Sequence, residues 1–99
     1  MRTMIRITIP VESGNKTILD GTLPKIIAET MERLKPEAAY FYPERGVRTS
    51  IMICDFNDVS DIPAIAEPLF TKLGAAVEFI PVMNADELKK GLSKAMQPR

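Results

Sequence analysis

The sequence predicts an α+β fold in which a four-stranded antiparallel sheet carries two helices on one face, with a short C-terminal helix added. Two observations predict this class. Four short apolar segments are bounded by proline, glycine or asparagine, as strands are. Two longer segments repeat apolar residues at the helical period, one after the first strand and one after the third. The 99 residues therefore form one domain with the order β-α-β-β-α-β.

The first strand is predicted in "MIRITIP", which closes at Pro10. Its residues alternate between apolar and other types, so one face packs on a core. That face carries Ile5, Ile7 and Ile9. The opposite face carries Met4, Arg6 and Thr8.

The segment from Lys16 to Leu34 is predicted as one kinked helix. Gly21 and Pro24 disfavour an unbroken helix, because proline removes a backbone hydrogen bond and crowds the preceding turn. The apolar residues nevertheless keep the helical phase across both positions, which favours one helix over two. Ser13 or Asn15 can cap its start.

A hairpin occupies the middle of the sequence. "EAAYFYP" is predicted as the second strand and "VRTSIMICDF" as the third, including residues 47–56. The link "PERG" contains the proline and glycine of a turn. We expect Glu44 and Arg45 in this turn to lie in solvent.

The C-terminal half repeats the pattern of helix and strand. Apolar residues recur at helical spacing from Ile62 to Leu73, and "AAVEFIPVM" then forms the fourth strand. Asn84 and Glu87 have the spacing of a capping box, which predicts a short last helix over Leu88–Met96.

This order of elements is the split βαβ, ferredoxin-like arrangement, in which the first and third strands are central. Its two helices cover one face of the sheet and leave the other face open. On the third strand we expect Val47, Ile51 and Ile53 to face the helices. The open face is then predicted to carry Arg48, Ser50, Met52, Cys54 and Phe56 from this strand, with Tyr40, Tyr42, Glu78 and Ile80 from its neighbours.

Much of this open face is apolar, and its projected area is roughly 350 Å² at ordinary strand spacings. An apolar patch of that size normally marks an interaction site. We expect a second copy of the chain to cover it, which predicts a homodimer.

The pattern "IRITI…YFYPERGVRTSIMICDF…AVEFIPVM" resembles the dimeric α/β-barrel superfamily, in which two ferredoxin-like chains stack their sheets. The resemblance covers nearly the whole chain and rests on topology. The stretch "PAIAEPLF…VEFIPVM" resembles a bacterial family of this group without an assigned role, so no functional residue carries over. In enzymes of the group the small-molecule pocket commonly lies between sheet and helices. Two locations for a site therefore stay open: between the sheet and the helices of one chain, and between the two stacked sheets.

Composition excludes several kinds of function. Thirteen basic and thirteen acidic residues cancel, so the chain lacks the positive field that nucleic-acid binding requires. No apolar run approaches the roughly 20 residues of a membrane span, and no signal peptide is visible. A single cysteine, Cys54, indicates a reducing, cytoplasmic compartment and is predicted to be a buried structural residue. Histidine is absent, so we expect no metal site and no cofactor. Haem degradation in the superfamily that the sequence resembles uses a histidine ligand, so we do not expect that activity here.

Six side chains remain as candidates for ligand binding or dimer contact. They are Tyr40, Tyr42, Arg48, Ser50, Arg6 and Glu78. One interpretation is a homodimeric module that binds a small ligand or serves only in assembly, with charges paired across the interface. The alternative is a small cofactor-free monooxygenase or isomerase that acts on an aromatic or lactone substrate. The polar groups that would converge to hold and deprotonate this substrate are Tyr40, Tyr42, Arg48, Ser50 and Glu78. The sequence assigns no catalytic residue.

Overall fold

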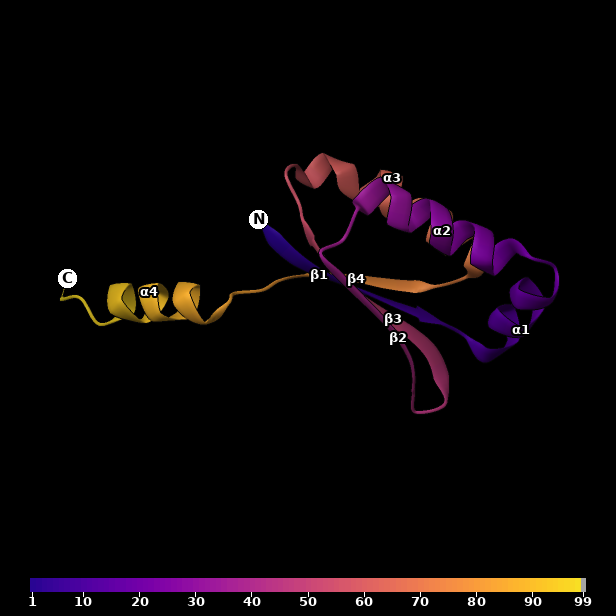
Figure 1. Ribbon diagram of the computed structural model, residues 1–99, viewed down its shortest axis with the longest axis horizontal. Helices are drawn as coiled ribbons and strands as arrows, with labels where there is room; N and C mark the ends of the chain where they lie inside the picture. Colours follow the sequence, from indigo (N-terminus) through magenta and orange to yellow (C-terminus); the bar gives the residue numbers. More distant parts are fainter. Residues whose placement is uncertain (99) are drawn as a thin grey trace.

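The computed structural model describes residues 1–98, which form an α+β fold with a four-stranded antiparallel sheet and four α-helices (Figure 1). The strands are β1 (Arg2–Ile9), β2 (Ala38–Glu44), β3 (Val47–Asp55) and β4 (Ala76–Pro81). The helices are α1 (Val11–Leu19), α2 (Thr22–Leu34), α3 (Ile62–Leu73) and α4 (Ala85–Ala95), and a short 3₁₀ turn, Val59–Asp61, precedes α3. The strand order is β2-β3-β1-β4.

The segment predicted as one kinked helix is two helices. α1 begins at Val11, directly after Pro10, and the chain leaves helical geometry at Gly21, whose φ is 84°. Glycine adopts positive φ without a steric penalty, so it allows a sharp break. The Asp20 carboxylate accepts a hydrogen bond from the backbone N–H of Thr22, the first residue of α2, at 2.9 Å. The prediction was wrong because an apolar stripe can keep its phase across a break between two helices.

The same region corrects the predicted cap. The residue before α1 is Pro10 and no side chain caps that end, so neither Ser13 nor Asn15 has this role. Pro24 lies in the first turn of α2, where a backbone N–H has no acceptor within the helix. Leu19, an apolar residue of the segment predicted as one helix, is 87% exposed.

The turn between β2 and β3 is tighter than predicted. Glu44 pairs with Val47, so only Arg45 and Gly46 lie in the turn, with φ of 52° and 79°. Positive φ at both positions is the type I′ turn, whose twist matches that of the strands. Glu44 therefore belongs to β2, and its carboxylate contacts the guanidinium of Arg6 instead of lying in solvent.

The two faces of β3 are the reverse of the predicted ones. Met52 lies opposite Ile5, and both side chains are 0% exposed. Ile51 and Ile53 are half-buried on the open face. The residues that lie on the helix side in place of the open face are Arg48, Ser50, Met52, Cys54 and Phe56. The prediction failed because β3 is apolar on both faces, so its alternation does not favour one orientation.

The other strands present the predicted faces. Ile5, Ile7 and Ile9 are buried with residues of α2 and α3, which lie on one side of the sheet (Figure 1). The helix residues in this core are Ile26, Ile65, Leu69 and Leu73. The open face carries Met4, Arg6, Tyr40, Tyr42, Ile51, Ile53, Glu78 and Ile80.

α4 projects away from the sheet (Figure 1), and the described chain measures 57 × 29 × 21 Å along its principal axes. The predicted capping box of Asn84 and Glu87 is confirmed, although the helix begins at Ala85 and not at Leu88. Within residues 1–98, no helix has the length and apolar content needed to cross a membrane.

Candidate functional site

A groove of about 360 Å³ lies on the helix side of the sheet, between α2 and the β2–β3 hairpin. Its volume falls within the roughly 300–1,000 Å³ of small-molecule pockets. The groove is lined by Ile9, Leu23, Ile27, Phe41, Tyr42, Pro43, Arg48, Thr49 and Ser50. Apolar side chains therefore form most of the wall, with the Arg48 guanidinium and the Ser50 hydroxyl as the polar groups on the helix side of the sheet.

Arg48 reaches the groove because of the reversed faces of β3. Its partner across the β1–β3 pair is Ile9, whose side chain is 5% exposed, so Arg48 also points toward the helices. One of its terminal nitrogens donates to the Asn15 amide oxygen at 3.1 Å. The guanidinium lies against Gly14 of α1, where an added Cβ would be only 2.6 Å from the same Arg48 nitrogen. A glycine in α1 therefore makes room for the positive charge.

This charge is not neutralised by a carboxylate. Among residues 1–98, the ion pairs involve Arg2, Arg6 and the chain's first amino group, and none involves Arg48. The amide oxygen of Asn15 occupies only one of the five N–H donors of a guanidinium. Arg48 therefore retains donors and a full charge for an anionic group beside the groove.

Ser50 contributes a second polar group to the same wall. It is 4% exposed, and its hydroxyl has no hydrogen-bond partner among the described residues. A buried polar group without a partner costs about 1–3 kcal/mol, so such groups are rare unless they serve a function. The backbone of β3 places Ser50 two residues from Arg48 on the same face of the sheet.

The groove therefore combines an apolar wall with hydrogen-bond donors from Arg48 and Ser50, which lie two residues apart on β3. A ring-sized molecule that carries a carboxylate or another anionic oxygen matches this arrangement, because Arg48 pairs with anions in fork geometry. Among the lining residues there is no carboxylate, lysine or thiol. The groove has the chemistry of a binding site more than that of a proton-transfer site.

The six candidates from the sequence fall into two places. Arg48 and Ser50 border the groove from the helix side of the sheet, and Tyr42 borders it while its hydroxyl donates to Glu44 on the open face. The remaining three, Tyr40, Arg6 and Glu78, lie on the open face of the sheet and do not reach it.

The charges on the open face are paired within one chain. The Arg6 guanidinium contacts the Glu44 carboxylate and lies 3.6 Å from that of Glu78. The Tyr42 hydroxyl donates to the same Glu44 at 3.4 Å. Arg6 and Glu78 therefore have charged partners within one chain, and the pairing of Arg6, Arg48 and Glu78 across a dimer interface stays a prediction.

Sequence reasoning missed the apolar wall of the groove. Leu23 and Ile27 lie in the segment predicted as one helix, and Phe41 lies in the predicted second strand, without any of them being a candidate. Phe41 is 55% exposed because it lies at the sheet edge beside the groove. The alternation of the strand shows which face Phe41 is on. It does not show that this side chain stays exposed, because that depends on the position of β2 at the edge of the assembled sheet.

A larger hollow of about 530 Å³ lies between α2 and α3, but its chemistry is less specific. Its wall includes the exposed charged residues Glu29, Glu32 and Arg33. The buried hydroxyl in it, that of Thr30, donates to the Ile26 carbonyl at 2.7 Å. This hollow therefore presents no unpartnered buried group to a ligand.

The thiol of Cys54 lies in the core and not in the groove. It is 2% exposed, and burial together with the nearby carboxylates of Asp55 and Glu37 raises its pKa. A thiol with a raised pKa is a poor nucleophile at neutral pH. In the part of the chain that the structure describes, no group of three or more histidine, cysteine, aspartate or glutamate side chains is arranged to hold a metal ion.

A scan against models of known protein families, a search of curated proteins and a search of solved structures each gave no match to this chain.

Proposed function

We propose that the chain is a homodimeric module that binds a small molecule with an apolar body and an anionic group. The apolar body would lie against Leu23, Ile27 and Phe41, and the anion would lie beside Arg48. The observation that carries the proposal is the buried hydroxyl of the lining residue Ser50, which has no hydrogen-bond partner in residues 1–98. A ligand oxygen beside the guanidinium would give that hydroxyl an acceptor.

The proposed dimer joins the open sheet faces of two copies, as in the dimeric α/β-barrel superfamily that the sequence resembles. It assumes the ferredoxin-like arrangement of strands and helices. The half-buried Met4, Ile51, Ile53 and Ile80 are neighbours on this face. Its central charge, Arg6, already contacts two carboxylates of its own chain, so a partner can cover it without leaving it unpaired.

The alternative, a cofactor-free oxygenase or isomerase, requires a group that takes a proton from the substrate. Glu78, the base expected for it, lies on the opposite face of the sheet from the groove. Tyr42 is the one lining residue with an ionisable hydroxyl, and that hydroxyl donates to Glu44 on the open face. Binding without catalysis therefore explains the groove better, because the groove has hydrogen-bond donors but no carboxylate to act as a base.

Benzoate is a suitable probe of the groove, with benzyl alcohol as its uncharged match. In titrations followed by amide NMR shifts, we expect Arg48→Gln to weaken benzoate binding about tenfold, because it removes a charge-assisted hydrogen bond. Ser50→Ala should weaken it less. The matched control is Arg45→Gln, since Arg45 lies in the exposed hairpin turn. Equal effects of the Arg45 and Arg48 changes, or no shifts at Ser50, would contradict the proposal.

The dimer is tested separately by light scattering across protein concentration. We expect twice the chain mass of 11.0 kDa for the wild type. Ile51→Glu should give monomers, because it places a charge in the centre of the joined faces. Val59→Glu is the control, since Val59 is 73% exposed and lies outside the sheet. A wild-type mass of one chain at every concentration would overturn the dimer.

A further inference from the structure

α4 has one apolar stripe, and no helix or strand of residues 1–98 packs against it. Leu88, Leu92 and Met96 follow one another at intervals of four residues, so they lie along one side of the helix. They are 46%, 55% and 82% exposed, and no residue of α4 is buried. Helices of this amphipathic kind are normally stable because the apolar side is covered.

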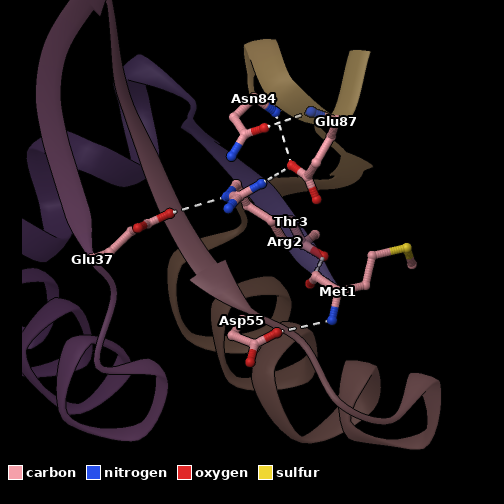
Figure 2. Close-up of polar contacts among 7 residues, drawn as sticks. All are labelled: Met1, Arg2, Thr3, Glu37, Asp55, Asn84 and Glu87. Carbon is pink, nitrogen blue, oxygen red and sulfur yellow. Dashed lines mark hydrogen bonds and ion pairs between the residues drawn. The ribbon is translucent and has the colours of Figure 1, made fainter. Parts of the chain in front are cut away.

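The start of α4 is fixed to the sheet and is not a loose tail. The Val82 N–H donates to the Arg2 carbonyl at 3.2 Å, which continues the pairing beyond β4. The Arg2 guanidinium contacts the Glu87 carboxylate and also lies 3.5 Å from that of Glu37 (Figure 2). The capping box completes this junction. The Asn84 backbone N–H donates to the Glu87 carboxylate at 2.9 Å, and the Glu87 backbone N–H donates to the Asn84 amide oxygen at 2.8 Å (Figure 2). The sheet therefore holds α4 pointing outward.

The exposed surface of the chain is too large for a compact monomer. Its accessible area is 6948 Å², whereas a compact chain of this mass exposes about 5,600 Å². Its radius of gyration is 16.1 Å, against about 12.6 Å for a compact domain of this length. The excess of roughly 1,300 Å² exceeds the about 800 Å² that each partner buries in a standard interface.

We infer that α4 packs its Leu88, Leu92 and Met96 side against a second copy of this chain, as an exchanged arm. α4 follows β4, whose Ile80 belongs to the open face, so the arm continues the surface that we propose as the dimer interface. In a two-fold dimer each copy gives one arm and receives one, so the contact is made twice. The inference rests on the proposed dimer and adds a second contact to it.

A membrane surface fits α4 less well than a protein partner. Within α4 the three lysines, Lys89, Lys90 and Lys94, are offset by Asp86 and Glu87, which leaves one net positive charge. Helices that bind anionic lipid surfaces carry a strongly basic polar face beside a large apolar face. The stripe from Leu88 to Met96 also extends only about 12 Å along the helix at the usual rise per residue.

The test compares two neighbouring positions of α4 by sedimentation equilibrium of the full chain. Leu92→Glu adds a carboxylate to the apolar side, and Ser93→Glu adds the same group to the polar side. We expect Leu92→Glu to raise the dimer dissociation constant about tenfold or more, because it replaces a buried contact by a charge. Ser93→Glu should leave it within about twofold. Circular dichroism of both variants should show unchanged helix content, since glutamate favours helices.

A Leu92→Glu protein that dimerises like the wild type would overturn the inference that α4 packs against the second copy. Ile51→Glu separates this result from a failure of the proposed dimer: if only Ile51→Glu gives monomers, the sheet interface stands and the arm does not. A monomeric wild type overturns both. Binding of the monomer to phosphatidylserine vesicles, lost on Leu92→Glu, would assign the stripe to a lipid surface and also overturn the inference.

Discussion

Ile5 lies directly opposite Met52 in the antiparallel pair of β1 and β3, and both side chains are fully buried. This relationship decides which face of β3 meets the helices. Because successive residues of a strand point to opposite faces, it also places Arg48 and Ser50 on the helix side. The candidate groove exists only because of this orientation.

Met52→Ala should destabilise the fold by about 2–5 kcal/mol, since it leaves a cavity in a closely packed core. The neighbouring Ile51→Ala should lose less than half as much in a dilute sample, because Ile51 is half-buried on the open face. Urea unfolding of both variants measures the difference. If Ile51→Ala were the more destabilising of the two, β3 would have the opposite orientation.

Gly14→Ala should disturb the groove without unfolding the chain. The added Cβ would be 2.6 Å from a terminal nitrogen of Arg48, so this flexible side chain must move and its bond to Asn15 is lost. Alanine favours a helix over glycine by about 1 kcal/mol, which offsets the crowding. We expect stability within about 1 kcal/mol of the wild type and weaker benzoate binding, read from NMR titration.

Gly91→Ala is the matched control for this substitution. Gly91 lies in α4, and its added Cβ would have no atom within 4 Å. It should stabilise α4 and leave benzoate binding unchanged. Equal binding by the Gly14→Ala and wild-type proteins would show that the place of Arg48 does not matter for the groove.

Cys54 should resist thiol reagents in the folded protein. Burial raises its pKa, and the carboxylates of Asp55 and Glu37 raise it further. Labelling with Ellman's reagent at neutral pH should be slow in buffer and fast in denaturant, because only unfolding exposes the thiol. Rapid labelling of the native chain would contradict the placement of Cys54 in the core.

The junction of α4 should weaken in acid. The Asn84 backbone N–H and the Arg2 guanidinium lower the pKa of Glu87 below its ordinary value. A carboxylate with a lowered folded-state pKa adds stability above the unfolded-state pKa, and this contribution is lost as pH falls through the folded-state pKa. Carbon chemical shifts of α4 should therefore show fraying in acid and full helix at neutral pH.

Glu87→Gln separates charge from capping at this junction. Glutamine can still accept the Asn84 N–H in a capping box, but it has no charge to lose. The variant should keep α4 at neutral pH and show a flatter dependence on acid. An unchanged acid transition would mean that other carboxylates fray the helix.

The sequence alone was sufficient to predict a feature where its residue pattern is compatible with one structure only. β1 alternates strictly between isoleucines and other residues, so its buried face was predicted correctly. The spacing of Asn84 and Glu87 likewise predicted the capping box. These are local signals, which depend on residues that are neighbours in the chain.

The candidate site was predicted in part and for the wrong face. Arg48, Ser50 and Tyr42 were identified as candidates from their residue types, and all three border the groove. Arg48 and Ser50 were expected on the open face, together with Arg6 and Glu78, which the sheet separates from them. Residue type indicated the chemistry, but the strand orientation decides which residues share a site.

The sequence by itself determined the order of the four strands, the apolar face of β1 and the cap of α4, because periodicity and capping act over a few residues. The tertiary structure decided the orientation of β3, whose Ile51, Met52 and Ile53 suit either face. It also decided the break at Gly21 and the outward direction of α4. Pairing with β1 resolves the ambiguity of β3, since an antiparallel register fixes every side chain of a strand at once.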